Sequence, residues 1–285
     1  MKQAAENMNT KINIGAAWRA AGQRIDRLDA RLLLEEVTGC HHADLIARPE
    51  QMVSADQAAR YESWVARRAA GEPLAYLLGS ADFYGLEFRV SPAVLIPRPD
   101  TEVLVNVALE KAAPRVAPRI VDLGSGSGIV AVTLAHLCRS AQLTAVDISA
   151  SALEVARDNA QRHGVSVDFL LGDWFAPLGA ARFDLIVSNP PYVRAGDAHL
   201  QDNGLPFEPP GALSDGVIGG DGLACIRAIV RGAPNHLQPG GWLLIEHGYD
   251  QAAQVRALLH DQGGAEIASW RDLAMIERVS GACWP

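Results

Sequence analysis

Short apolar runs alternate with longer helical stretches from about residue 100 onward, and this alternation restricts the fold more than any other feature of the sequence. Helical stretches such as 150–164 and 221–237 separate the apolar runs. The runs that look like buried strands are RIVDLG, LTAVDI, VDFLLGD, FDLIVSN and GWLLIEHG. Strands that alternate with helices predict an α/β domain with a parallel, doubly wound sheet.

The last two apolar runs depart from this alternation. Residues 265–272 and 274–284 follow one another with almost no chain between them. We therefore expect a hairpin here, and one antiparallel strand at this end of a mostly parallel sheet. At the other end of the domain, Asp100 is placed to cap a helix that runs through Val103 and Val107.

The N-terminal part of the chain has helical periodicity and is rich in Ala, Leu and Arg. Gly39 marks one helix end, and Ser54 with Gln57 forms a capping-box pattern at the start of another helix. Residues 81–91 alternate apolar and other side chains around Gly85, as a short hairpin does. We expect three segments: a small helical domain over 1–75, a hairpin linker over 76–99 and the α/β domain over 100–285.

The composition is that of a soluble globular protein, with 49% hydrophobic and 20% charged residues among 285. The start of the chain has no apolar signal segment, and no apolar stretch approaches the roughly 18 residues that a membrane span needs. We therefore expect a cytoplasmic protein. The four cysteines lie far apart without a CxxC pair, and His41 adjoins His42, so free buried thiols are expected and no metal site is indicated.

The net charge of −8 is unevenly distributed along the chain. Residues 1–99 hold 12 basic and 12 acidic side chains, whereas residues 100–285 hold 13 basic and 21 acidic ones. A protein that grips a nucleic-acid backbone usually shows a basic stripe, because neutralised phosphates supply most of the non-specific affinity. The sequence shows no such stripe, which disfavours DNA or RNA as the main partner.

A glycine-rich turn, DLGSGSG, follows the first predicted strand. Gly124, Gly126 and Gly128 let the backbone approach a ligand closely at the carboxyl end of the sheet, where open α/β folds bind ligands. Ile129 stands where the dinucleotide fingerprint GxGxxG needs its last glycine. The turn therefore disfavours an NAD-dependent oxidoreductase, while a purely structural glycine turn stays open.

Acidic residues follow the next two predicted strands. Asp147 ends TAVD, where a carboxylate can accept hydrogen bonds from the two hydroxyls of a ribose. Asp173 and Trp174 follow the third strand, and they offer an acid and an aromatic face to the amino group and the plane of an adenine. Each acid alone is as consistent with a helix cap, but their positions at successive strand ends favour a nucleoside pocket.

The segment SNPPY, residues 188–192, ends the fourth predicted strand and therefore shares this crevice. Both prolines have a fixed φ, and Asn189 before them is biased toward an extended backbone. The Asn189 side-chain oxygen and the Pro190 carbonyl can together accept both hydrogens of one planar NH2 group, with Tyr192 offering a face against its plane. An amide or aromatic amine held in this way can be oriented for in-line attack on a sulfonium methyl. The alternative, a Pro-Pro turn that only ends a strand, is disfavoured by the neighbouring glycine loop and Asp147.

The motifs DLGSGSG, TAVD, GDW and SNPPY, in this order, resemble an S-adenosylmethionine-dependent class I methyltransferase with a Rossmann-like sheet. More narrowly, the chain resembles the HemK/PrmC family of glutamine N5-methyltransferases over nearly its whole length. EPLAYLLG, IPRPDTE and the glycine-rich GGDGL at 219–223 carry this narrower resemblance. The family modifies the glutamine of the GGQ motif in class 1 peptide-chain release factors, which implies a release factor as the partner.

The resemblance implies roles for particular residues. The loop Gly124, Ser125, Gly126, Ser127 and Gly128 is expected to line the methionine end of S-adenosyl-L-methionine, whose product is S-adenosyl-L-homocysteine. Asp147 is then expected at the ribose and Asp173 with Trp174 at the adenine. Asn189, Pro190, Pro191 and Tyr192 are expected to hold the substrate glutamine amide, with Asn189 also next to the cofactor.

Other segments of the family pattern have less defined roles. Arg98, Thr101 and Glu246 lie in matching segments near the crevice, and the resemblance assigns them no chemistry. Residues 194–219, rich in Pro, Gly and Asp, are expected to form a long loop that closes over a substrate peptide. The helical domain and the acidic crevice together are expected to grip a folded release-factor domain.

Three other functions remain as alternatives. The nearest is a glutamine methyltransferase of a ribosomal protein, followed by an adenine-N6 methyltransferase of nucleic acid, which shares the NPPY motif. A binding module without activity is disfavoured because Asn189 and the glycine loop are both present.

Overall fold

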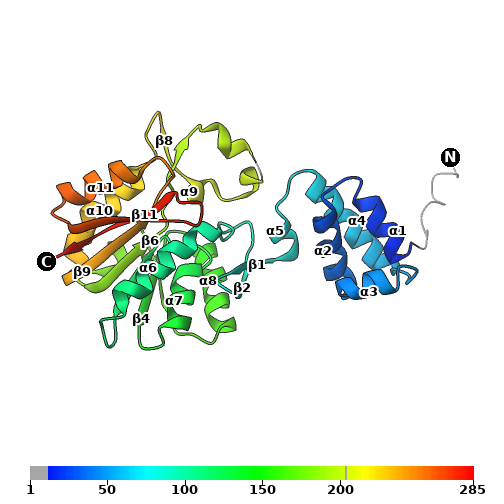
Figure 1. The fold of residues 1–285 in the computed structure, drawn as a ribbon, viewed down its shortest axis with the longest axis horizontal. Helices are drawn as coiled ribbons and strands as arrows, with labels where there is room; N and C mark the ends of the chain where they lie inside the picture. The colour runs from blue at the N-terminus through cyan, green and yellow to red at the C-terminus, as the bar shows by residue number, and fades with distance from the viewer. Residues whose placement is uncertain (1–11, 203) are drawn as a thin grey trace. The chain divides into compact units, whose positions relative to one another are not determined.

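The computed structural model describes residues 12–202 and 204–285 of the chain (Figure 1). The chain divides into two compact units, Met1–Gly79 and Ser80–Pro285. No helix in the described ranges is both long and apolar enough to cross a membrane.

Within residues 12–79, the first unit consists of five helices around its own apolar core, as the periodicity predicts. The helices are α1 (Ile14–Ala21), α2 (Arg27–Thr38), α3 (His42–Ala47), α4 (Ala55–Ala69) and α5 (Leu74–Leu78). The predicted capping box at α4 is confirmed, because the Ser54 hydroxyl accepts from the Gln57 N–H at 3.2 Å and the Gln57 side chain accepts from the Ser54 N–H at 3.0 Å. Gly39 ends α2 in the left-handed conformation. Ile14, Leu33, Leu34 and Val65 form the centre of the core.

The second unit begins with the predicted hairpin, β1 (Ser80–Phe83) and β2 (Leu86–Arg89), paired antiparallel. Asn159 joins the hairpin to the glycine loop. Its buried side chain accepts from the Arg89 N–H at 2.7 Å, donates to the Arg89 carbonyl at 3.0 Å and donates to the Ser127 carbonyl at 2.8 Å. The hairpin thus supports the glycine loop from outside the sheet.

The central sheet has seven strands in the order β10-β11-β9-β6-β3-β4-β5. The strands are β3 (Arg119–Leu123), β4 (Gln142–Asp147), β5 (Asp168–Leu171), β6 (Phe183–Ser188), β9 (Leu237–Glu246), β10 (Ala265–Arg271) and β11 (Glu277–Trp284). Strand β11 runs antiparallel to both of its neighbours, and the remaining pairs are parallel. The predicted α/β class, the mostly parallel sheet and its single antiparallel strand are confirmed.

Helices cover both faces of the sheet (Figure 1). They are α6 (Glu102–Ala112), α7 (Ile129–Leu137) and α8 (Ala150–Arg162) on one face, and α10 (Ala224–His236) and α11 (Ala252–Asp261) on the other. Successive strand residues alternate between the two cores: Ile120 packs with the first group and Val121 with the second. Because helices cover both faces, ligands reach the sheet only at its ends.

Two local expectations are wrong. Asp100 does not cap a helix: it lies in the 3-10 turn η1 (Pro99–Thr101) before α6, and its carboxylate pairs with Arg278 at 3.0 Å. The segment 194–219 is not a plain loop, because β7 (Val193–Ala195) pairs in parallel with β8 (Ser214–Ile218). Between these strands lie η3 (Ala198–Gln201), η4 (Leu205–Phe207) and α9 (Pro210–Leu213); a further 3-10 turn, η2 (Ala176–Leu178), follows β5. Parallel pairing of such short strands leaves no local signal in the sequence.

Candidate active site

A cavity of about 430 Å³ lies at the carboxyl ends of β3, β4, β5 and β6, within the range expected for a small-molecule site. The predicted site residues that line it are Gly124, Ser125, Gly126, Ser127, Asp147, Asp173, Trp174, Asn189 and Pro191. The lining does not include Gly128, Pro190 or Tyr192. The fold therefore brings together residues from four separate strand ends, as is expected at the carboxyl edge of a parallel sheet.

The glycine loop is held against the neighbouring strand and against Trp174. The N–H groups of Gly124 and Ser125 both donate to the Val146 carbonyl, at 2.8 and 3.1 Å. Gly124 has a φ of +74°, and a Cβ there would lie 3.3 Å from the Trp174 ring. A side chain at this position would therefore be strained in the left-handed region and would push the indole back by a few tenths of an ångström.

The Asp147 carboxylate has a fixed orientation in the cavity wall. One oxygen accepts from the Gly126 N–H at 2.8 Å, and the other accepts from the Ser149 N–H at 2.8 Å. A carboxylate oxygen can accept more than one hydrogen bond. Asp147 can therefore accept hydroxyl groups of a ligand while it keeps the glycine loop in place.

Asp122 also lines the cavity, and it is a site residue that the sequence reasoning missed. It is buried, and the Ser125 hydroxyl donates to its Oδ2 at 2.7 Å. Burial, with a contribution from the charge of Asp147, raises the pKa of Asp122 to about 7. The signal in the sequence is an acidic residue inside an otherwise apolar strand, directly before the glycine turn.

The NPPY segment presents two acceptors at the end of β6. The Asn189 amide nitrogen donates to the Thr101 hydroxyl oxygen at 3.2 Å. Among the hydrogen bonds of the described residues, none is accepted by the Asn189 side-chain oxygen or by the Pro190 carbonyl. Neither oxygen is used by a hydrogen bond within the described residues, and the expectation that the two together hold a planar NH2 group stays a prediction.

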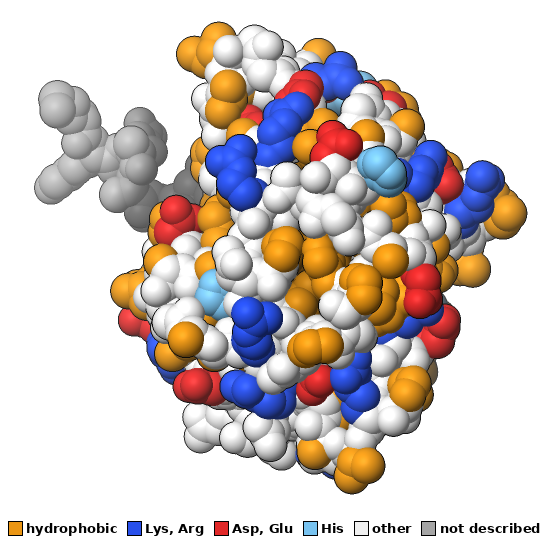
Figure 2. All heavy atoms as spheres, turned by 90° about the vertical axis from the view of Figure 1, so that its left-hand side faces the viewer, with side chains coloured by type: hydrophobic (Ala, Val, Ile, Leu, Met, Phe, Trp, Pro, Cys, Tyr) orange, Lys and Arg blue, Asp and Glu red, His pale blue; other side chains and the backbone are white. Residues whose placement is uncertain are grey.

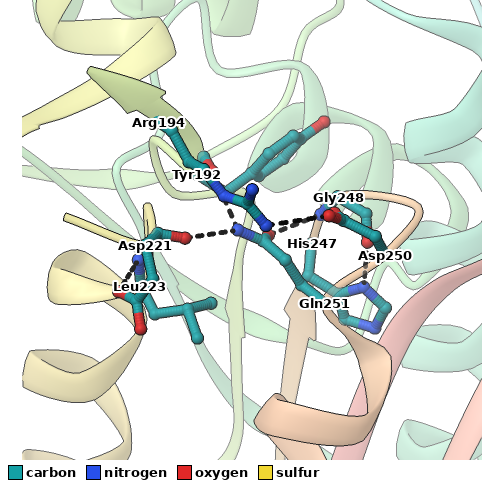
Figure 3. A network of polar contacts seen from close by, with 8 residues as sticks. All are labelled: Tyr192, Arg194, Asp221, Leu223, His247, Gly248, Asp250 and Gln251. Atoms are coloured by element: carbon teal, nitrogen blue, oxygen red, sulfur yellow. Dashed lines mark hydrogen bonds and ion pairs between the residues drawn. The ribbon is translucent and has the colours of Figure 1, made fainter. Parts of the chain in front are cut away.

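The hydroxyl and the carbonyl of Tyr192 both have hydrogen-bond partners. Its hydroxyl donates to Glu246 Oε1 at 3.4 Å. Burial is the main cause that raises the pKa of this hydroxyl, and the negative charge of Glu246 raises it further, so the phenol stays neutral. Its carbonyl accepts from the Gln251 side-chain nitrogen at 3.0 Å (Figure 3). Gln251 also donates to the Asp221 carbonyl and accepts from the Gly248 N–H. This network connects the NPPY segment to the GGDGL segment.

A second connection joins two chain segments that line the cavity. Buried Glu208 accepts from the Ile96 N–H at 3.0 Å and forms an ion pair with Arg98. Residues 93–95 and 209–215, which flank these contacts, both contribute to the cavity lining. The Arg98–Glu208 pair therefore links two segments of the cavity wall, a role that the sequence pattern did not specify.

One cysteine, Cys225, is among the residues that line the cavity, and no histidine is. All four cysteines are free thiols, as expected, but only Cys283 is buried. In residues 12–202 and 204–285, no group of three or more His, Cys, Asp or Glu side chains is arranged to hold a metal ion.

Comparison with known proteins identifies the family. The PrmC N-terminal domain family matches residues 15–79, and the methyltransferase small domain family matches residues 99–202. A release factor glutamine methyltransferase from Bordetella pertussis is 52% identical over 258 residues, spanning 90% of this chain and 94% of that protein. The chain belongs to the release factor glutamine methyltransferase family. A second member, from Vibrio cholerae, is 42% identical over 278 residues and covers 94% of this chain and 96% of its own length.

Solved structures with the same architecture are more distant in sequence. A methyltransferase from Pyrococcus furiosus superposes with a TM-score of 0.51 at 15% identity, covering 81% of this chain and 98% of its own. A 16S rRNA methyltransferase from T. thermophilus superposes with a TM-score of 0.53 at 24% identity, covering 72% of this chain and 50% of its own. These likenesses establish the methyltransferase fold, and the resemblance drawn from the motifs is confirmed by the family members.

Proposed function

We propose that this protein transfers a methyl group from S-adenosyl-L-methionine to the side-chain amide nitrogen, N5, of the glutamine in the GGQ motif of class 1 peptide-chain release factors. The observation that carries the proposal is Asn189, whose side chain lines the cavity with its amide nitrogen paired to Thr101, in a chain that is 52% identical to a release factor glutamine methyltransferase. The nitrogen gains the methyl group as the sulfonium–methyl bond breaks, and the other products are S-adenosyl-L-homocysteine and one proton lost from the amide nitrogen.

The residues around the cavity suit this cofactor. Asp147 is oriented to accept the two ribose hydroxyls, and Trp174 with Asp173 can receive the adenine. Asp122 places a carboxyl group beside the glycine loop, where a ligand with positive charge favours its ionised form. The cofactor, when bound, supplies an electrophilic methyl group on a sulfonium, so the protein needs neither a metal nor a strong base.

The protein's own contribution is to position the acceptor. An amide nitrogen is a weak nucleophile because its lone pair is delocalised over the carbonyl. Asn189 Oδ1 and the Pro190 carbonyl hold its two hydrogens, which orients the nitrogen and holds the reacting atoms roughly 3 to 3.5 Å apart. The same two oxygens favour the positive charge that grows on the nitrogen during transfer. Because a secondary amide has only one hydrogen left, this pair of acceptors also favours a single methylation.

The partner proposed is a protein rather than a nucleic acid. The α/β domain holds all of the excess negative charge, and on the face drawn in Figure 2 the basic side chains are scattered among acidic and apolar ones. We propose residues 1–75 as the substrate-recognition domain, residues 76–99 as the linker and residues 100–285 as the catalytic domain. Release factors act in the cytoplasm, and we propose that the methylation takes place there. Unchanged release-factor binding after removal of residues 1–75 would refute the recognition role.

A substrate comparison tests the proposal. Equal concentrations of purified release factor, ribosomal protein and double-stranded DNA are incubated separately with the enzyme and methyl-labelled S-adenosyl-L-methionine. We expect label in the release factor alone. Label in the ribosomal protein or in DNA would instead support one of the alternative methyl acceptors.

A further inference from the structure

Asn159 on α8 is a fully buried polar side chain that contacts the glycine loop without lining the cavity itself. Its amide oxygen accepts from the Arg89 N–H at 2.7 Å. Its amide nitrogen donates to the Arg89 carbonyl at 3.0 Å and to the Ser127 carbonyl at 2.8 Å. The side chain thus makes three hydrogen bonds inside the protein, and all of them go to backbone groups of other segments.

The backbone of Arg89 fixes the orientation of the Asn159 amide. A backbone N–H can only donate and a carbonyl can only accept, so the Asn159 oxygen must face the Arg89 N–H and its nitrogen must face the Arg89 carbonyl. The reversed amide would oppose donor to donor and acceptor to acceptor. The second hydrogen of the amide is thereby directed to the Ser127 carbonyl. The hairpin therefore determines where the glycine loop finds this hydrogen-bond donor.

The peptide unit between Ser127 and Gly128 is held at both of its polar ends. Its carbonyl accepts from Asn159, and its N–H donates to the Ser125 carbonyl at 2.8 Å. Gly128 is the N-cap of α7 with a φ of +81°, so rotation of this peptide would change both the path of the loop and the start of the helix. A Cβ on Gly128 would lie 3.0 Å from the Ala156 Cβ, so α8 also packs directly against the loop.

The other partner of Asn159 leads into a second part of the cavity wall. Arg89 ends β2, and the chain continues from it to residues 93–95, which line the cavity. Ser127 is buried and lines the same cavity. Asn159 thus holds two segments of the wall through their backbones. Because a buried carbonyl without a partner is costly, loss of this side chain would loosen the loop.

We propose that Asn159 is a positioning residue for S-adenosyl-L-methionine, which acts through the Ser127 carbonyl and the Arg89 backbone. It orders the glycine loop and residues 93–95 before the cofactor binds. A loop that is already ordered loses less conformational freedom on binding, so this preorganisation increases the affinity. The hairpin, which lies inside the segment proposed as a linker, is then part of the cofactor site. The inference concerns cofactor binding and applies to any methyl acceptor.

The first test measures cofactor affinity by calorimetry on the full chain, with S-adenosyl-L-methionine as the titrant and no methyl acceptor. Asn159→Ala removes all three hydrogen bonds and should raise the dissociation constant by about tenfold, because the loop must then be ordered on binding. Asn159→Asp keeps the shape and the acceptor for the Arg89 N–H but, when ionised, cannot donate to Ser127. It should raise the dissociation constant by a similar factor. Thermal unfolding of each variant verifies that it is folded.

Two substitutions that weaken the attachment of the hairpin elsewhere are the matched controls. Asn106→Ala on α6 removes the acceptor of the Tyr84 hydroxyl, which lies at 2.7 Å. Glu87→Gln removes the ion pair between β2 and Arg162 of α8, at 2.8 Å. Neither contact involves the glycine loop, and both are exposed and contribute little, so the dissociation constant should stay within about twofold of wild type.

The second test follows the loop itself by hydrogen exchange in NMR spectra of the full chain, without cofactor. The Gly128 N–H should exchange about tenfold faster in Asn159→Ala than in wild type, because its peptide unit has lost the partner of its carbonyl. In the wild-type protein both hydrogens of the Asn159 amide should exchange slowly, which is a measurement that needs no variant to fold. Rapid exchange of these two hydrogens would overturn the proposal.

A role of Asn159 in stability alone gives a different pattern. Equal dissociation constants in Asn159→Ala and Asn106→Ala, or faster exchange confined to β2, would refute the positioning role. In the release-factor assay, Asn159→Ala should raise the KM for the cofactor and leave kcat at saturating cofactor within about threefold of wild type, because Asn189 is unchanged. Failure of the wild-type enzyme to methylate a release factor would refute the proposed function and leave the calorimetric comparison valid.

Discussion

Gly222 offers a sharp test of how the NPPY segment is supported. Its φ is +76°, and a Cβ there would lie 2.3 Å from the Tyr192 carbonyl oxygen and 3.2 Å from the Gln251 side-chain nitrogen. Ordinary contact between carbon and oxygen needs roughly 3.5 Å, so Gly222→Ala must displace the Tyr192 backbone by on the order of 1 Å. A displacement of this size at a positioned acceptor lowers kcat by roughly 100-fold.

Gly219→Ala is the matched control for this substitution. Gly219 has a φ of +71°, and a Cβ there would meet nothing within 4 Å. Both substitutions place alanine in the left-handed region, at a cost of roughly 1 to 2 kcal/mol of folding free energy. Only Gly222→Ala adds the collision with Tyr192 and Gln251.

The assay combines thermal unfolding, calorimetric cofactor binding and steady-state methylation of a release factor. We expect Gly219→Ala to lose stability but keep kcat, and Gly222→Ala to lose more stability and most of its kcat, with cofactor affinity changed by less than about threefold. Similar kcat values in the two variants would show that the Tyr192 carbonyl does not need its position, and would refute the reasoning.

Three further outcomes are expected. Asn189→Ala should abolish methyl transfer and leave calorimetric cofactor affinity nearly unchanged; equal loss of both would make the residue part of the cofactor pocket. Asp147→Ala should instead weaken cofactor binding by about 10-fold to 100-fold in the same titration. This loss corresponds to the roughly 1.5 to 3 kcal/mol that hydrogen bonds to a charged group contribute. Because the pKa of Asp122 is raised to about 7 and a cationic ligand favours its ionised form, cofactor affinity should fall as the pH drops below 7. Calorimetric titration with the cofactor in buffers of different ionisation enthalpy should show that the wild-type protein releases a proton on cofactor binding. The Asp122→Asn variant should release none.

The parts of the fold and site that the sequence predicts correctly have local signals. The alternation of apolar runs and helices is enough to indicate the sheet, and the short gap before the last strand indicates the hairpin at its end. Asp147 and Asn189 are recognisable because each ends an apolar run, and the carboxyl ends of parallel strands meet at one edge.

The parts that the sequence does not predict depend on contacts between distant segments. Thr101 and Asn189 meet only when η1 and the end of β6 are assembled, so neither residue type nor spacing reveals their hydrogen bond. Gly222 can be noticed as part of a glycine-rich motif, but its collision with Tyr192 exists only in the folded chain. The raised pKa of Asp122 likewise reflects burial, which is a property of tertiary structure.

The most direct test of the account is mass spectrometry of the release-factor peptide that contains the GGQ motif, after incubation with the enzyme and S-adenosyl-L-methionine. We predict that this peptide gains one methyl group, that fragmentation places it on the glutamine side chain, and that Asn189→Ala leaves the peptide unmodified. An unmodified peptide with the wild-type enzyme, or a methyl group on another residue, would contradict the central claim.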